Sequence, residues 1–94
     1  IIAPIVGHVG DGNFHTLPIA LPEDVDAWTR IKAFVERLSE RAIAMDGTCT
    51  GEHGIGQGKI KYLRQEMGPA VDMMLAVKKA LDPNDILNPG KLFN

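Results

Sequence analysis

Two histidines flank a glycine-rich turn near the start of the 94-residue chain. His8 and His15 lie on either side of Asp11-Gly12, and an Asp-Gly pair is a strong signal for a two-residue hairpin turn. In that register His8 and His15 face each other, with Cβ atoms about 4.5–5.5 Å apart. Two imidazoles at that separation could hold Zn²⁺ or Mn²⁺. The alternative is a pair of half-buried strand histidines without a ligand.

A second group with possible chemistry lies in the glycine-rich segment 47–58, where Glu52 and His53 are adjacent. Neighbouring side chains in an extended segment point in opposite directions. Glu52 could therefore complete a metal site with the two hairpin histidines, while His53 stays free for proton transfer. The alternative is a solvated Glu52 and a His53 that caps a helix, and the residues alone leave this choice open.

The same loop does not fit the known nucleotide-binding patterns. A P-loop needs glycine six residues before its lysine and Ser or Thr after it, but His53 and Ile60 occupy those places around Lys59. A dinucleotide-binding loop follows a strand, whereas a helix is predicted before this one. Cys49 is interpreted as an inert buried thiol, because small buried thiols are common and the chain has no second cysteine.

The elements that must position these residues are a hairpin and three helices. β-Branched residues in 2–9 and 14–21 predict the two strands. Apolar residues at helical spacing predict helices from Pro22 to Asp46-Gly47, from Lys59 to Gly68-Pro69, and from Val71 to Asp82-Pro83. The tail 82–94 is predicted to form turns. The fold class is therefore α+β, with an antiparallel β-hairpin, three helices and too few strands for a complete sheet.

Composition excludes several classes of protein. The chain is 45% hydrophobic, its formal charge is −2 and its pI is 5.9, so no nucleic-acid partner is expected. No apolar run approaches the roughly 18 residues of a membrane span. A single cysteine and no signal peptide indicate a cytoplasmic protein. The apolar start at Ile1 without a methionine suggests a piece of a longer chain, which would leave an apolar surface exposed and favour a homodimer of the fragment.

Three motifs in order resemble one family of flavoenzymes. GHVGDGNFH at 7–15, GTCTGEHGIGQGK at 47–59 and DPNDILNPGK at 82–91 look like the C-terminal end of the FAD-linked oxidases. This group includes D-lactate dehydrogenase, glycolate oxidase and D-2-hydroxyglutarate dehydrogenase. The resemblance implies that residues 1–94 are the C-terminal part of a larger substrate- and metal-binding domain, built on an antiparallel sheet with helices, with the FAD-binding domain outside the chain.

The resemblance also implies a chemistry. In this family the parent enzyme oxidises a small D-2-hydroxy acid with FAD and passes electrons to a quinone, an electron-transfer flavoprotein or a cytochrome, in some members at the membrane periphery. It implies a divalent ion on His8, His15 and Glu52, with His53 as the base. Asn88 is expected near the flavin, as a cofactor contact or a structural contact. An asparagine that contacts substrate in the hydroxyglutarate branch is replaced by Leu17, which favours a smaller or less polar acid.

Two functions from other classes compete with this prediction. The chain could be a metal-binding or interaction module without redox chemistry, in which the glycine-rich loop contacts a partner. It could also be a purely structural domain. The second is disfavoured because all three histidines and Glu52 lie in the least regular segments, where functional residues concentrate.

Overall fold

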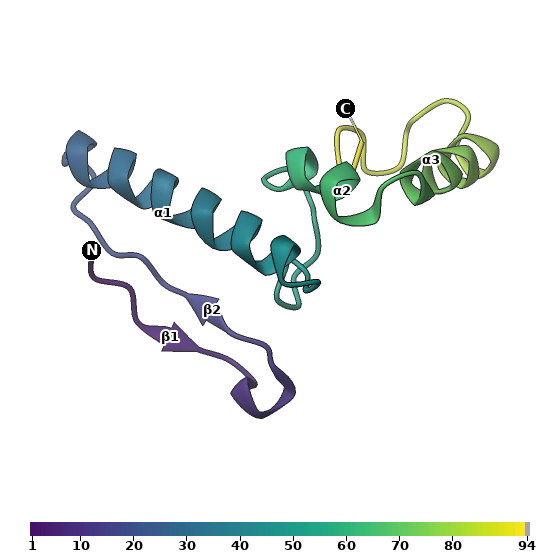
Figure 1. Ribbon diagram of the computed structural model, residues 1–94. Coiled ribbons are helices and arrows are strands. Elements are labelled where there is room, and N and C mark those ends of the chain that lie inside the picture. The colour runs from purple at the N-terminus through teal and green to yellow at the C-terminus, as the bar shows by residue number, and fades with distance from the viewer. Residues whose placement is uncertain (94) are drawn as a thin grey trace.

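The computed structural model describes residues 1–93 as one hairpin followed by three helices (Figure 1). Asn94, the last residue of the predicted tail, lies outside the described residues. The elements in chain order are β1 (Ile5–Val6), the 3₁₀ turn η1 (Val9–Asp11), β2 (His15–Thr16), α1 (Val25–Ala44), α2 (Ile60–Met67) and α3 (Ala70–Leu81). The predicted α+β class, with an antiparallel hairpin and three helices, is confirmed.

The register of the hairpin differs from the prediction. Ile5 pairs with Thr16 and Val6 pairs with His15. His8 therefore lies in the connection between the strands and does not face His15 across the sheet. The predicted pairing of the two histidines is wrong, and a different contact must bring them together if they share an ion.

The longer connection between the strands has a local cause. The carbonyl of His8 accepts hydrogen bonds from the N–H groups of Asp11 at 2.8 Å and Asn13 at 3.2 Å, so the chain turns through η1 and not at a two-residue loop. Gly7 leaves β1 with φ +146°, and a Cβ there would stand 2.7 Å from the Cα of Phe14. Only glycine permits this close approach of the two backbones.

The helices begin and end close to the predicted residues. The side chain of Asp24 accepts the N–H of Ala27 at 3.0 Å and caps α1, as aspartate commonly does at this position. The helix ends before Asp46, which has φ +65°. Breaks at Gly68-Pro69 and Asp82-Pro83 separate α2 from α3 and α3 from the tail. Among residues 1–93, no helix combines the length and apolar character that a membrane span requires.

The largest cluster of buried side chains lies between the glycine-rich loop and the last two helices. Its buried side chains are Cys49, Ile55, Tyr62, Leu63 and Val71, and Phe93 of the tail packs against them. The hairpin runs beside α1 (Figure 1), and the indole Nε1 of Trp28 donates to the carbonyl of Leu21 at 2.9 Å. The predicted apolar surface is present on the hairpin, whose exposed large side chains include Ile2, Ile5, Val6, Val9 and Ile19.

Candidate metal and catalytic site

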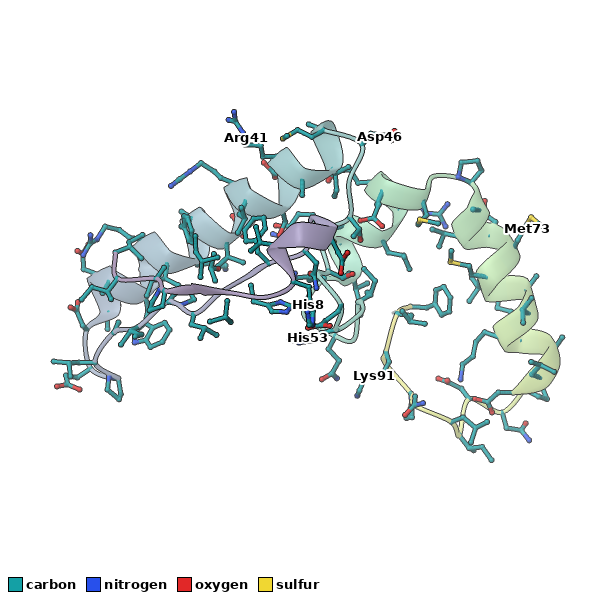
Figure 2. All side chains as sticks on the ribbon, turned by 90° about the horizontal axis from the view of Figure 1, so that it is seen from below. His8, Arg41, Asp46, His53, Met73 and Lys91 are labelled. Carbon is teal, nitrogen blue, oxygen red and sulfur yellow. The ribbon has the colours of Figure 1, made fainter. Side chains whose placement is uncertain are left out.

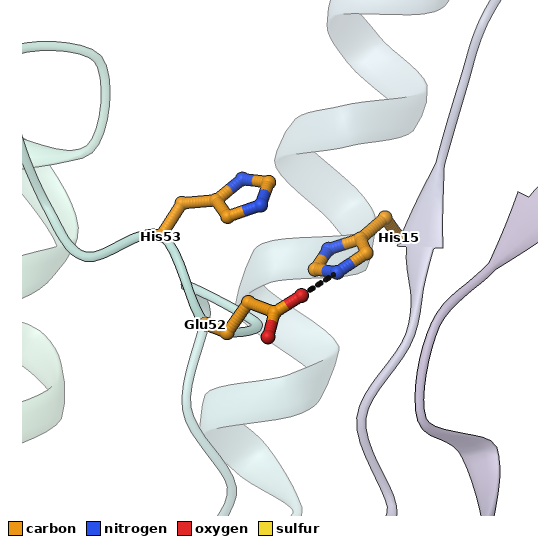
Figure 3. A group of neighbouring side chains, drawn as sticks. All are labelled: His15, Glu52 and His53. Atoms are coloured by element: carbon orange, nitrogen blue, oxygen red, sulfur yellow. Dashed lines mark hydrogen bonds and ion pairs between the residues drawn. The ribbon is translucent and has the colours of Figure 1, made fainter.

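Glu52 lies at the centre of a cluster of the three histidines. Its Oε1 is 2.8 Å from Nε2 of His15, and its Oε2 is 3.8 Å from Nε2 of His8 (Figure 3 shows the first contact). The glycine-rich loop thus places one carboxylate oxygen near each histidine of the hairpin segment. The structure therefore places Glu52 beside each of the two histidines predicted as metal ligands, through different carboxylate oxygens and not through the predicted strand pairing.

A tight turn sets the direction of the Glu52 side chain. The N–H of His53 donates to the carbonyl of Thr50 at 3.2 Å, which closes the turn. Gly51 has φ +61°, and a Cβ there would stand 3.0 Å from the ring of His15. Glycine is therefore required both for the backbone conformation and for the approach of the loop to the histidine.

The side chains of Glu52 and His53 were predicted to point in opposite directions along an extended segment. This is not observed, because the segment is a turn and not an extended strand. The ring of His53 stacks on that of His15, with centroids 4.6 Å apart and planes 8° from parallel (Figure 3). His15, Glu52 and His53 each offer a ligand atom, and these atoms lie within 4.8 Å of one another. His53 is therefore close enough to act on a molecule held by the other side chains.

The electrostatics of the cluster favour an ionised carboxylate. The hydrogen bond with His15 is the main cause that holds the pKa of Glu52 below its ordinary value, and the neighbouring histidines act in the same direction. The side chain of His15 is 17% exposed, against 46% for Glu52 and 67% for His8. His15 is thus the most enclosed of the three and His8 the most open to solvent.

Glu52 lies close enough to both His15 and His8 to share an ion with either, but among residues 1–93 the group whose ligand atoms all lie within 4.8 Å of one another is His15, Glu52 and His53, without His8. Zinc–ligand bonds of about 2.0–2.2 Å keep two ligands of one ion within roughly 4 Å of each other. The His15–Glu52 and His8–Glu52 contacts of 2.8 Å and 3.8 Å both meet this limit. Imidazole nitrogens and a carboxylate are ligands that zinc and manganese accept.

An unpaired amide oxygen lies beside this donor set. Oδ1 of Asn13 is buried and has no hydrogen-bond partner, and it would be 3.3 Å from a Cβ on Gly51. Metal-bound histidines usually donate their second ring nitrogen to an acceptor of this kind. Asn13 was not among the predicted site residues, although it lies between the two histidines of the motif in the sequence.

Other predicted site residues lie elsewhere. Asn88 is exposed in the tail, where its carbonyl accepts the N–H of Lys91 at 3.2 Å, and no contact within residues 1–93 joins it to the histidine cluster. Leu17 directly follows β2 and is half exposed. Burial, aided by the charge of Glu66, raises the pKa of the Cys49 thiol, which supports its interpretation as an inert core residue.

Comparison with known proteins identifies the family. Residues 1–92 match the model of the FAD linked oxidases, C-terminal domain. The chain belongs to this family. It is 57% identical to a probable mitochondrial D-lactate dehydrogenase of Danio rerio, 46% identical to a mitochondrial D-lactate dehydrogenase [cytochrome] of Arabidopsis thaliana, and 42% identical to the glycolate oxidase subunit GlcD of Bacillus subtilis. No solved structure matches the chain.

These alignments cover 99%, 99% and 93% of the chain, but only 19%, 17% and 19% of the three relatives. The chain thus spans about a fifth of the length of the curated relatives that it matches. The names of the first two relatives also contradict one prediction. Cytoplasmic location was inferred from the lone cysteine and the missing signal peptide, and this inference is wrong because neither feature distinguishes the cytoplasm from other reducing compartments.

Proposed function

We propose that the chain is the C-terminal part of the substrate- and metal-binding domain of a mitochondrial FAD-dependent dehydrogenase of D-2-hydroxy acids. The observation that carries the proposal is the convergence of His8, His15 and His53 on Glu52, in a chain of the FAD-linked oxidase family. The D-lactate dehydrogenase names of two relatives support D-lactate as the substrate, and glycolate is the second choice. Leu17, an apolar and half-exposed side chain, favours such a small acid.

His8, His15 and Glu52 would hold a divalent ion, Zn²⁺ or Mn²⁺. The two contacts to Glu52 support this set, and three protein ligands leave positions open for a substrate. The ion would supply Lewis acidity, which lowers the pKa of a coordinated hydroxyl. Glu52 has the charge this role needs, because its hydrogen bond with His15 holds its pKa low.

His53 would act as the base. Its ring stacks on His15 and so lies beside the proposed ligand set. In the oxidation, the hydroxyl proton would move to a ring nitrogen of His53, while the hydrogen on the adjacent carbon leaves with its electron pair as hydride. FAD supplies the acceptor for that hydride, which gives the 2-oxo acid and reduced flavin. Asn88 is proposed as a contact of the cofactor, and a cytochrome, a quinone or an electron-transfer flavoprotein would reoxidise the flavin.

A metal titration of the 94-residue chain distinguishes the proposed ligand role of His8 from the proposed base role of His53. Zn²⁺ and Mn²⁺ are added to the wild type and to the His8→Ala and His53→Ala variants, with binding followed by calorimetry and by the NMR signals of the histidine rings. Loss of a ligand in His8→Ala should weaken binding by more than the roughly 10–100-fold that loss of an outer-shell partner costs. His53→Ala should keep most of the affinity.

Two results would contradict the proposal. If the wild-type chain binds neither Zn²⁺ nor Mn²⁺, the proposed metal site is wrong. A larger loss of affinity in His53→Ala than in His8→Ala would place His53 among the ligands and leave the reaction without its proposed base.

A further inference from the structure

The segment before Glu52 is held by two charged side chains of one helix. The N–H of Cys49 donates to Oε1 of Glu66 at 2.8 Å, and the carbonyl of Cys49 accepts a hydrogen bond from Nζ of Lys59. The hydroxyl of Thr48 donates to Oε2 of Glu66 at 3.0 Å. Both polar backbone groups of Cys49 and both oxygens of Glu66 are therefore engaged.

The positions of these two charges on α2 are unfavourable for the helix itself. Lys59 is the N-cap residue of α2, and Glu66 is the last residue but one. The helix dipole favours acidic groups at the N-terminus and basic groups at the C-terminus, and both side chains violate this preference. The contact that both side chains make with Cys49 therefore explains the positions of Lys59 and Glu66 better than a stabilising effect on α2 does.

Cys49 is held by packing as well as by the hydrogen bonds of its N–H and carbonyl groups. Its side chain is 6% exposed and belongs to the core between the loop and the last two helices. Only Thr50 and Gly51 separate this anchored residue from Glu52. The hydroxyl of Thr48 also accepts the N–H of Thr50 at 3.4 Å, so the contacts of Glu66 reach the first residue of the turn.

We propose that Glu66 is a positioning residue, which places Glu52 and His53 against His15 by holding Thr48 and Cys49. This inference rests on the proposed function, because it concerns the same metal and catalytic site. The hairpin supplies His15 and the helical core supplies the turn, so the distance between them depends on how firmly the turn is tied to α2. Glu66 acts at a distance, through the backbone.

The test uses Glu66→Ala and Glu66→Gln in the 94-residue chain. The amide of Gln can accept from the N–H of Cys49 and donate to the hydroxyl of Thr48, so it restores both contacts without the charge. The first readout needs no metal: nuclear Overhauser contacts between the ring protons of His15 and His53. These contacts should be lost in Glu66→Ala and kept in Glu66→Gln.

The second readout is the affinity for Zn²⁺. It should fall by about 10–100-fold in Glu66→Ala, as for other residues that orient metal ligands, and return towards the wild-type value in Glu66→Gln. Glu40→Ala, at an exposed position of α1, is the matched control and should change neither readout. Thr48→Val removes one contact of Glu66 and the bond to the N–H of Thr50 without touching the core, so it gives a milder test of the same tether if Glu66→Ala does not fold.

Unchanged ring contacts in a folded Glu66→Ala chain would overturn the proposal, and so would a Glu66→Gln chain as perturbed as Glu66→Ala. A wild-type chain with stacked rings but no affinity for zinc would instead reject the metal site of the proposed function. The ring contacts of the variants would still decide the role of Glu66 in that case.

Discussion

Glu52 connects the two parts of the candidate site because its carboxylate has two oxygens. One oxygen contacts the enclosed His15 and the other faces the more exposed His8. A neutral side chain such as glutamine could not offer two equivalent acceptors, nor would it balance the charge of a divalent ion. The geometry therefore explains why a carboxylate, and not merely a polar residue, stands at this position.

His53 is the residue on which the chemistry of the proposal depends. In the longer flavoenzyme, His53→Ala should lower kcat by about 10²–10⁴-fold, which is the usual contribution of a positioned base. Because His53 is proposed as the base and not as a ligand of the ion, the flavin absorbance spectrum and the metal content should stay unchanged. Steady-state kinetics with D-lactate measures the effect, and turnover close to the wild-type rate would exclude His53 as the base.

The helices were the elements that the sequence predicted best. Their apolar residues recur at helical spacing and their ends carry strong local signals, such as Asp46-Gly47 after α1 and Gly68-Pro69 after α2. All three begin and end within a few residues of the predicted positions. Such signals are local, so the sequence contains them without reference to the rest of the fold.

The hairpin and the loop were harder to predict because glycine allows several turns of similar energy. Asp11-Gly12 suggested a two-residue turn, but the chain closes through η1, with two hydrogen bonds to the carbonyl of His8. The turn at Gly51 likewise depends on contacts with α2 and with His15. The predicted site residues His8, His15, Glu52 and His53 lie near one another, but their spacing in the sequence alone could not predict the contacts between them.

The first part of the tail after α3 is held by a buried carboxylate, which makes it sensitive to acid. Asp82 is 7% exposed and accepts the N–H groups of Ile86 at 3.0 Å and Leu87 at 2.9 Å, while it also pairs with Lys78. The bond with Lys78 is the main cause that lowers the pKa of Asp82, and the two N–H groups lower it further. Because the folded pKa is depressed, this stabilisation is complete above the ordinary aspartate pKa and disappears only as the pH falls through the folded value.

Hydrogen exchange can test this sensitivity. Protection of the Ile86 and Leu87 amides should persist at about pH 3.9, where a free aspartate is half protonated, and should be lost at lower pH. The amide of Leu92, bonded to the carbonyl of Gly56 at 2.8 Å, has no titrating acceptor and serves as the control. The Asp82→Asn variant should show no such step. Loss of protection at Leu92 in the same step would indicate general unfolding and contradict the assignment to Asp82.

At the scale of the whole molecule, the chain consists of a small helical core and a hairpin that exposes much of its apolar surface. The hairpin and α3 lie at opposite ends of an elongated molecule measuring 44 × 33 × 20 Å (Figure 1). The histidine cluster lies between the two parts, where the hairpin meets the glycine-rich loop. The geometry of the site therefore depends on how the two parts are held together.

Self-association through the hairpin is the expected behaviour of the chain in isolation. Ile5 is 63% exposed on a strand whose outer edge is open, and both apolar surface and free strand edges promote pairing between chains. Sedimentation velocity should show a dimer at high concentration, and Ile5→Lys should weaken it because an edge lysine opposes strand pairing. Met73→Lys is the matched control, since Met73 is 74% exposed on the distant α3 (Figure 2). A monomer at all concentrations, or equal weakening by both variants, would exclude the hairpin as the interface.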